Sequence, residues 1–525
     1  MHAAATLVAA TLVAAGMPVL GRTPLPAGAL VLSASPAPGA IGWGPTSSEL
    51  RRARALVGRM SLAQRAGQVL VVSYSGTSPP TALVRELHLG GVIAFAANLT
   101  TPARVRDGNR ALQRSVRARR GYPLMVGVDQ EGGRVARLTT GATRFPSFMT
   151  AGAARRPALT RAAFAASAGE LADVGFTADF APVADVTIGA RDPTIGSRSA
   201  GSRPERVGRQ TVAALRGVAA SGLLPVLKHF PGHGSVTTDS HLALPVQSRS
   251  LATLRARDLV PFRAGVQAHA PAVMVGHLDV RAVDPGVPAS LSHAVVTGLL
   301  RKQMGFRGLA VTDSLTMRAV SDRFGVAGAA VTALRAGEDV LLMPGSARVA
   351  RAGIVRAVRA GRLRRDRLDE AATRMVALLL HQQARGFRPV PAGSAGALSR
   401  RLSAAGVTSV AGPCSGRLVG STVRVTGRRS TVRTFVTAAR AARLAVGRAG
   451  TTVRLAGLGA GPQTGDVVVA TDTPYVLGRS TAPVKIASYG DSPGAMRALV
   501  SVLLGRAAAP GRLPVGVVGV ARTGC

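Results

Sequence analysis

The chain has 525 residues, with 66 Lys and Arg against 25 Asp and Glu, so its formal net charge is +41. The length indicates two domains, and a hydrophobic content of 47% excludes wholesale disorder. Aromatic residues make up only 3%, and the arginines are scattered instead of forming a basic stripe, which argues against nucleic-acid binding. The charge instead favours weak electrostatic association with an anionic cell wall or membrane surface.

The N-terminal segment is apolar over residues 3–20 and is followed by Ala27-Gly28-Ala29, an A-x-A pattern. This combination is typical of a secretory signal peptide. No Lys or Arg precedes the apolar run, so a retained anchor is the alternative. We therefore expect residues 1–45 to be a signal peptide or anchor with a leader, and the protein to be secreted or held at the cell surface or cell wall.

Two cysteines, Cys414 and Cys525, are the only ones in the chain. In an oxidising compartment they could form a disulfide, which would join the last residue to the start of the second domain. Two unpaired thiols are the alternative.

Short apolar runs alternate with longer helix-like segments between residues 67 and 344. Such runs are typical of parallel strands buried on both faces. Eight strand-then-helix units favour a (β/α)8 TIM barrel over an open doubly wound sheet, and we assign the barrel domain to residues 46–386. The expected strands are 68–74, 91–95, 124–129, 178–186, 224–230, 272–280, 309–314 and 339–344, with crossover helices including 155–175, 204–221 and 250–269.

A segment rich in Pro, Gly, Ala and Ser follows at 387–400 and is typical of a linker. Beyond it, residues 401–525 again alternate apolar runs with helix-like segments, which predicts a smaller α/β sandwich domain. Its expected strands are 422–427, 452–457, 466–472 and 484–490, followed by a helix over 493–505.

Ionisable residues stand at the ends of five barrel strands. In a parallel barrel the C-terminal ends of the strands form the ligand-binding face. A purely structural barrel has no need for ionisable groups at five of these ends, so we expect an active site there. The residues are Asp129, Asp185, Lys228 with His229, His277 and Asp313.

The segment KHFPGHGSVTTDSH, residues 228–241, permits two interpretations. In one, four side chains bind a catalytic metal, although the Pro and Gly residues predict a loop in which the ligands do not converge by helical spacing: His229, His233, Asp239 and His241. Alternatively, Asp239 orients His241 as a proton donor near neutral pH, and Asp313 acts as a carboxylate nucleophile.

KHFPGHG followed by DSH, together with DQEGGRV (129–135) and VTDSLTM (311–317), resembles glycoside hydrolase family 3. Within it, the chain is similar to the bacterial β-N-acetylglucosaminidases that act on cell-wall fragments. The resemblance implies retaining hydrolysis of terminal β-linked N-acetylglucosamine from peptidoglycan fragments or chito-oligosaccharides. Asp313 would form a covalent glycosyl-enzyme, and His241, held by Asp239, would protonate the leaving oxygen and then activate water.

The same resemblance implies a set of sugar-binding residues and no metal or cofactor. Asp185 and His277 match recurrent family positions whose roles are not separable from support of the barrel end. Two other functions stay open: a phosphorylase, because a histidine acid/base does not repel phosphate, and a non-catalytic wall-binding protein. The implied sugar-binding residues are Asp129, Arg137, Arg198, Lys228 and His229.

Overall fold

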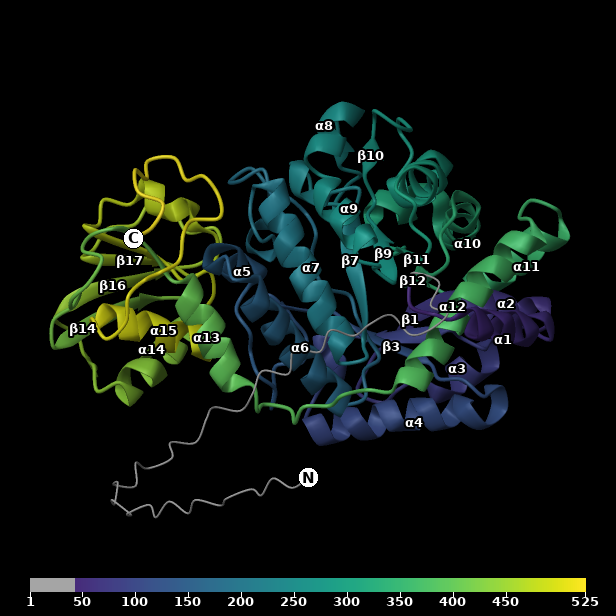
Figure 1. Ribbon diagram of the computed structural model, residues 1–525, viewed down its shortest axis with the longest axis horizontal. Coiled ribbons are helices and arrows are strands. Elements are labelled where there is room, and N and C mark those ends of the chain that lie inside the picture. Colours follow the sequence, from purple (N-terminus) through teal and green to yellow (C-terminus); the bar gives the residue numbers. More distant parts are fainter. Residues whose placement is uncertain (1–42) are drawn as a thin grey trace, which may run out of the picture. The chain divides into compact units, whose positions relative to one another are not determined.

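The computed structural model describes residues 43–525 (Figure 1). The predicted apolar segment 3–20 and the A-x-A pattern lie outside the described residues. None of the helices within the described part combines the length and the apolar character needed to cross a membrane.

Eight parallel strands form the barrel, in the order β11-β9-β7-β6-β3-β2-β1-β12. A parallel bridge between Val311 and Val340 brings the last strand beside β11 and so completes the ring. Each strand overlaps one of the eight predicted runs, which confirms the predicted barrel. The strands are β1 (Leu70–Ser73), β2 (Gly91–Ala94), β3 (Met125–Val128), β6 (Ala178–Asp179), β7 (Leu224–Phe230), β9 (Ala272–Val275), β11 (Leu309–Thr312) and β12 (Leu341–Leu342).

Helices surround these strands (Figure 1), and the strand side chains are buried almost without exception because helices cover the outer face. Several helices begin with Pro in the first turn, where its missing N–H costs no hydrogen bond. The helices are α1 (Ser47–Gly58), α2 (Leu62–Gln68), α3 (Thr81–Leu87), α4 (Pro102–Arg120), α5 (Phe148–Ala154), α6 (Pro157–Asp173), α7 (Pro204–Ala220), α8 (Leu251–Ala256), α9 (Val260–Gln267), η5 (Ala294–Gln303), α10 (Arg318–Ala336), α11 (Ala347–Arg359) and α12 (Arg365–Arg385).

Two predicted strands, 178–186 and 272–280, are shorter in the structure than in the prediction. β6 ends at Asp179, and Pro182 beyond it has no N–H with which to continue the ladder. After β9 the chain leaves the barrel wall, and β10 (Asp279–Val280) pairs with β8 (Val246–Gln247) in a separate small sheet. The apolar pattern therefore located both strands but not their ends.

The second domain is a six-stranded sheet in the order β13-β18-β17-β16-β14-β15, with β13 antiparallel to β18 and the other pairs parallel. The predictions missed β13 and β15, and α13 begins within the predicted linker 387–400. The elements are α13 (Gly396–Gly406), β13 (Thr408–Ala411), β14 (Thr422–Gly427), α14 (Arg429–Ala441), β15 (Ala445–Val446), β16 (Thr451–Ala456), β17 (Val467–Ala470), η6 (Pro474–Arg479), β18 (Val484–Ala487) and α15 (Pro493–Leu503).

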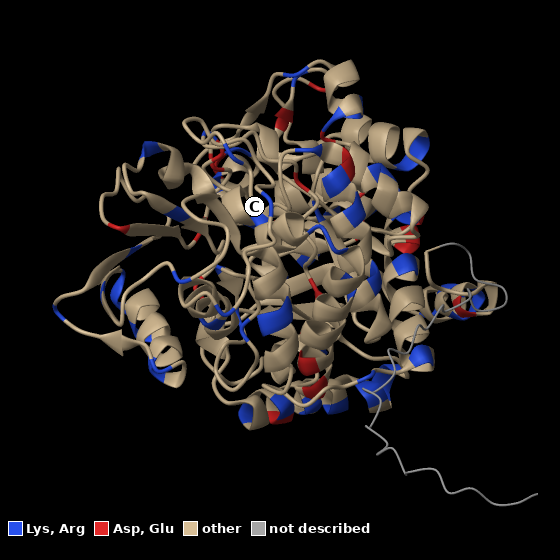
Figure 2. Cartoon of the chain, turned by 60° about the vertical axis from the view of Figure 1, so that its left-hand side comes forward, with Lys and Arg blue, Asp and Glu red and all other residues tan. Residues whose placement is uncertain are grey.

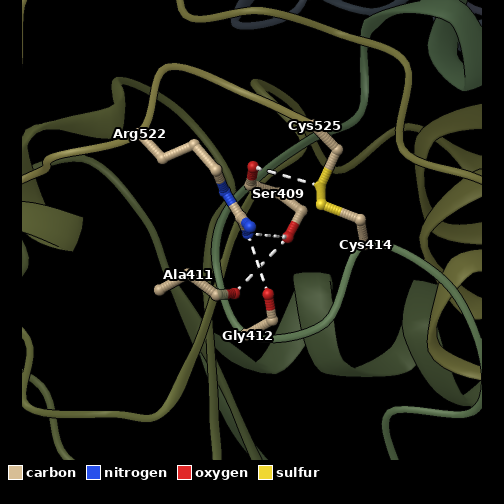
Figure 3. The surroundings of a disulfide bond; sticks show 6 residues. All are labelled: Ser409, Ala411, Gly412, Cys414, Arg522 and Cys525. Carbon is tan, nitrogen blue, oxygen red and sulfur yellow. Dashed lines mark hydrogen bonds between the residues drawn. A yellow bond between two sulfur atoms is a disulfide. The ribbon is translucent and has the colours of Figure 1, made fainter.

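Cys414 and Cys525 form a disulfide with their Cα atoms 5.6 Å apart (Figure 3). Beside it, the Arg522 guanidinium donates to the carbonyl oxygen of Gly412 at 2.9 Å and to the Ser409 hydroxyl at 3.4 Å. The end of the chain is thereby fixed to β13 and the turn that follows it. Of the two alternatives for the cysteines, the structure has the paired one.

Removal of this disulfide should destabilise the protein. The bridge closes a loop across a sequence separation of 111 residues. The chain-entropy description gives about 4–5 kcal/mol for a loop of that size, because the cross-link restricts the unfolded chain. We expect the double substitution Cys414→Ser/Cys525→Ser to lower the free energy of unfolding by up to that amount in urea titrations. Reductant should lower the stability of the native protein equally and leave the double variant unchanged. Two titratable thiols in the unfolded, unreduced native chain would contradict the bridge.

Candidate active site

The five predicted positions lie at the C-terminal ends of the barrel strands. Lys228 and His229 lie near the C-terminal end of β7, and Asp313 directly follows β11. Asp129 directly follows β3, and His277 lies just beyond β9. The chain before Asp185 is held beside β7 by a parallel bridge between Val183 and Lys228. The polar groups therefore meet at one end of the barrel.

A buried ionic cluster, which we call the Lys228 cluster (Asp129, Glu131, Arg198 and Lys228), occupies this end. Lys228 Nζ lies 2.6 Å from Asp129 Oδ1 and 2.7 Å from Glu131 Oε1. Arg198 donates from Nε and Nη2 to the two oxygens of Glu131, both at 2.8 Å. The side chains of Lys228 and Glu131 are each only 2% exposed. Two of the predicted sugar-binding residues, Arg198 and Lys228, thus meet on Glu131, and a third, Asp129, joins through Lys228.

Glu131 is the residue of this cluster to which the sequence analysis gave no role. It lies in β4 (Gln130–Gly132), two positions after Asp129. In extended backbone, side chains two apart share a face, so the acid-x-acid spacing in DQEGG was the available signal. That signal does not identify the partners, because Lys228 comes from β7, which is separated from β3 by β6.

The charges of the Lys228 cluster stabilise one another. Burial raises the pKa of Glu131, but Arg198 and Lys228 together outweigh burial and hold it well below its usual value. For Lys228, burial lowers the pKa, but Asp129 and Glu131 outweigh it and leave the pKa raised. Glu131 and Lys228 are consequently charged at neutral pH.

Glu131→Gln should lower the stability of the protein, because it removes a negative charge from the Lys228 cluster. Removing one partner of a buried ion pair costs about 3–5 kcal/mol, because a buried cation loses its counter-charge. The pKa of Glu131 is lowered from 4.5 on folding, so its stabilisation is present above that pH and is lost as the pH falls through the folded value. We expect the difference in unfolding free energy between native protein and variant to be constant above about pH 5 and to narrow below about pH 4.5. Urea titrations across this range test it, with the exposed Glu205→Gln as the control. A difference that widens on acidification would contradict the assignment.

Asp185 orients His229. Its carboxylate accepts from His229 Nδ1 at 2.7 Å and from the backbone N–H groups of His229 and His233 at 3.2 and 2.7 Å. The other ring nitrogen of His229, Nε2, lies 3.4 Å from Arg198 Nη2. Burial raises the pKa of Asp185, but His229 and His233 outweigh it and lower the pKa. Asp185 therefore fixes the orientation of the His229 ring.

Asp313 is held by backbone hydrogen bonds at the end of β11. Its backbone N–H donates to Val275 O at 2.9 Å, and its carboxylate accepts the Ser314 N–H at 2.7 Å. Burial raises its pKa, but His229 and His277, followed by the Ser314 N–H and Lys228, lower it overall. The carboxylate is consequently ionised at neutral pH, as a nucleophile must be.

His277 supports the turn that follows Asp313. Its Nε2–H donates to the carbonyl oxygen of Ser314 at 2.9 Å, and its Nδ1 accepts from the Ser290 hydroxyl at 2.7 Å. Burial lowers the pKa of His277, which keeps the ring neutral in this arrangement. His277 thus positions the segment that carries Asp313.

The Asp239–His241 pair lies on a loop at the barrel end. Asp239 Oδ1 accepts from His241 Nδ1 at 2.7 Å and from its backbone N–H at 2.9 Å. The His241 side chain is 64% exposed, whereas Ser240 between them is buried with its hydroxyl 2.8 Å from His233 Nε2. No hydrogen bond within residues 43–525 links this pair to Asp313. The loop is therefore anchored through Ser240 and presents His241 Nε2 to solvent above the barrel end.

Arg137 stands apart from the Lys228 cluster. Its backbone N–H donates to Gln130 Oε1 at 2.8 Å, and its guanidinium carbon lies 5.5 Å from the centre of the Phe95 ring. Its buried Nε has no hydrogen-bond partner, so one donor is left for a ligand. No ion pair among the described residues joins Arg137 to the other predicted sugar-binding residues.

The donors of the metal-site alternative do not converge. His229 bonds to Asp185, His233 bonds to Ser240, and Asp239 bonds to His241. Across residues 43–525, no three His, Cys, Asp or Glu side chains are grouped so that they could hold a metal ion. The arrangement instead supplies an ionised carboxylate, an oriented histidine and a set of charged hydrogen-bonding groups.

Known proteins match both the sequence and the fold. The Glycosyl hydrolase family 3 N terminal domain matches residues 61–378. Beta-hexosaminidase LpqI of Mycobacterium tuberculosis is 37% identical over 329 residues, which cover 61% of this chain and 83% of that protein. Beta-hexosaminidase A of Pseudoalteromonas piscicida is 34% identical over 287 residues, or 51% of this chain, and the chain spans 48% of that protein.

Among solved structures, a glycoside hydrolase family 3 beta-N-acetylglucosaminidase from Paenibacillus sp. str. FPU-7 superposes with a TM-score of 0.80 and 29% identity. The match covers 88% of this chain and 100% of that one, so it includes both domains. With the barrel and the ionisable groups at its C-terminal end, these matches show that the chain is a glycoside hydrolase that belongs to glycosyl hydrolase family 3.

Proposed function

We propose that the protein is a retaining β-N-acetylglucosaminidase that removes terminal β-linked N-acetylglucosamine from glycosides. The observation that carries the proposal is the ionised Asp313 at the end of β11, with the Lys228 cluster and His229 grouped around the same barrel end. The names of the relatives, which are beta-hexosaminidases and a beta-N-acetylglucosaminidase, support the choice of sugar.

In the first step an Asp313 oxygen bonds to the anomeric carbon while the glycosidic C–O bond breaks. His241 Nε2–H gives its proton to the departing oxygen, and Asp239 on Nδ1 stabilises the ring while it is charged. In the second step His241 takes a proton from water, and the resulting hydroxyl displaces Asp313. Two displacements at one carbon retain the β configuration.

The charged groups around Asp313 hold the sugar. Lys228 and Arg198 offer N–H donors, Asp129 offers acceptor oxygens, and His229 offers Nε2. Such charge-assisted hydrogen bonds are short and directional, so they fix the ring at the distance from Asp313 that displacement needs.

A comparison of chromogenic substrates tests this function. We expect hydrolysis of an aryl N-acetyl-β-glucosaminide to exceed that of the matching β-glucoside by at least two orders of magnitude, with free N-acetylglucosamine as the product. The assay is run with and without inorganic phosphate. Formation of a sugar phosphate would identify a phosphorylase instead, and inactivity on both glycosides would leave a non-catalytic wall-binding protein.

We also propose that the natural substrates are peptidoglycan fragments and that the protein works outside the cytoplasm or at the cell wall. The Cys414–Cys525 disulfide supports an oxidising compartment. The net charge of +41 supports association with an anionic wall, and Lys and Arg are spread over many elements in the view of Figure 2. Fractionation of the producing cells tests location. Binding to isolated walls that falls steeply with salt tests the association.

A further inference from the structure

The loop that carries Arg198, residues 187–202 and here called the Arg198 loop, is held together by Asp192. Its carboxylate accepts from the Thr187 hydroxyl at 2.8 Å and from three backbone N–H groups at 2.8–3.2 Å, those of Thr194, Ile195 and Gly196. Arg134 adds hydrogen bonds to the carbonyl oxygens of Thr194 and Ile195 at 2.6 and 3.0 Å. These hydrogen bonds give the loop a defined conformation, and that conformation sets the position of Arg198.

The second domain touches this loop immediately before Arg198. Asp472 and Thr473, which follow β17, lie against Ser197 and Gly196: a Cβ on Gly196 would be 3.3 Å from Thr473 Cγ2. Asp472 and Ser197 are both buried, and the Ser197 hydroxyl lies near enough to the Asp472 carboxyl to lower its pKa. Burial raises the pKa of Asp472 more than Ser197 and Arg134 lower it. The residue next to Arg198 thus rests on a side chain of the other domain.

A second contact fixes the end of the Arg198 loop. The Ser202 N–H donates to Pro514 O at 3.1 Å, and a Cβ on Gly201 would lie 2.6 Å from that oxygen. Gly201 has φ +146, so both its conformation and its surroundings require a glycine there. The loop is consequently held by the second domain at two separate points.

Domain docking itself has another basis. Met149 and Ala153 of α5 share a buried apolar cluster with Leu513 and Val515 near the chain end. Burial of this apolar surface holds the domains together without Asp472. The contact between Asp472 and Ser197 can therefore be removed without separating the domains.

We propose that Asp472 and Thr473 are positioning residues, which set the place of Arg198 from the second domain. The inference rests on the proposed function. Arg198 reaches Glu131 with two bonds of 2.8 Å and lies 3.4 Å from His229, so a shift of the loop would disturb the whole Lys228 cluster. Misplacement by about 1 Å of groups that orient a substrate can reduce turnover by about a hundredfold.

Asp472→Ala in the full-length protein tests this inference. We expect kcat/KM for an aryl N-acetyl-β-glucosaminide to fall by about tenfold or more, with the thermal unfolding midpoint changed little. Asp472→Asn, which keeps a group able to bond to the Ser197 hydroxyl, should stay within about twofold of the native protein. Ser197→Ala removes the same contact from the barrel side and should reproduce the loss. It decides the question if Asp472→Ala does not fold.

Asp491→Asn is the matched control, because this second-domain carboxylate pairs with Arg144 of the barrel at 3.2 Å and does not contact the Arg198 loop. It should leave kcat/KM unchanged. In an Arg198→Ala background, Asp472→Ala should cause no further loss, since residues that act through one group are not additive.

Loss in that background as large as in the native protein would overturn the inference, as would unchanged activity of Asp472→Ala or Ser197→Ala. If the native enzyme is active, either result contradicts only the inference about Asp472 and Thr473 and leaves the proposed function in place. An inactive native enzyme contradicts the proposed function itself.

Discussion

Asp313→Asn should abolish almost all turnover. The amide cannot form the glycosyl ester, and no other carboxylate is assigned to attack the anomeric carbon. We expect kcat to fall by about three orders of magnitude or more, which corresponds to about 4 kcal/mol of transition-state stabilisation. Steady-state hydrolysis of an aryl N-acetyl-β-glucosaminide measures the loss.

Two observations separate chemistry from folding in this experiment. Asp322→Asn, an exposed carboxylate on α10 paired with Arg318, should retain full activity. A fluorinated N-acetylglucosaminide that traps the intermediate should label a peptide containing Asp313, identified by mass spectrometry. Labelling of a different carboxylate would contradict the assignment of the nucleophile.

His241→Ala should affect substrates according to their leaving groups. A general acid contributes about 10²–10⁴ in rate when the departing oxygen needs a proton, and little when it leaves as a stable phenolate. We therefore expect a loss in that range for a disaccharide and a much smaller loss for glycosylation of the enzyme by an activated aryl glycoside. Pre-steady-state measurement of aryl release isolates this step.

Two further variants complete this test: Asp239→Ala, which removes the partner of His241, and His293→Ala, which is the control. Asp239→Ala should produce the same selectivity between leaving groups, because the 2.7 Å contact between Asp239 and His241 then no longer stabilises the protonated ring. His293→Ala replaces an exposed histidine that lies after β10 in the chain, outside the loop of His241. It should leave the rates on both substrates unchanged. Equal losses on both substrates would show that the loop has only a structural role.

The pattern of the sequence was sufficient to predict the barrel and the end of it at which the ionisable groups gather. Strands such as β3 and β11 are buried along their whole length, and this burial makes them continuous apolar runs that can be recognised locally. The residue that follows such a run, for example Asp313, then stands at the C-terminal end of a strand whatever its neighbours are. Lys228 and His229 were located in the same way.

The ends of the strands, and strands as short as β13, were harder to predict from the sequence. β13 was missed because its pairing with β18 joins segments far apart in the chain, and a run as short as Thr408–Ala411 carries little periodicity of its own. The predicted strand 178–186 was too long because apolar residues continue past Asp179, where the regular ladder of β6 ends and only an isolated bridge between Val183 and Lys228 follows.

The sequence by itself determined the kind of fold, the barrel end at which the ionisable groups gather and the residue types available there. Only the tertiary structure decided their partners. Lys228 meets Asp129 across 99 residues of chain, Glu131 joins Lys228 to Arg198, and Asp472 of the second domain lies against the Arg198 loop. Burial and periodicity are properties of a local segment, whereas a contact of 3 Å depends on how barrel closure and domain docking bring distant segments together.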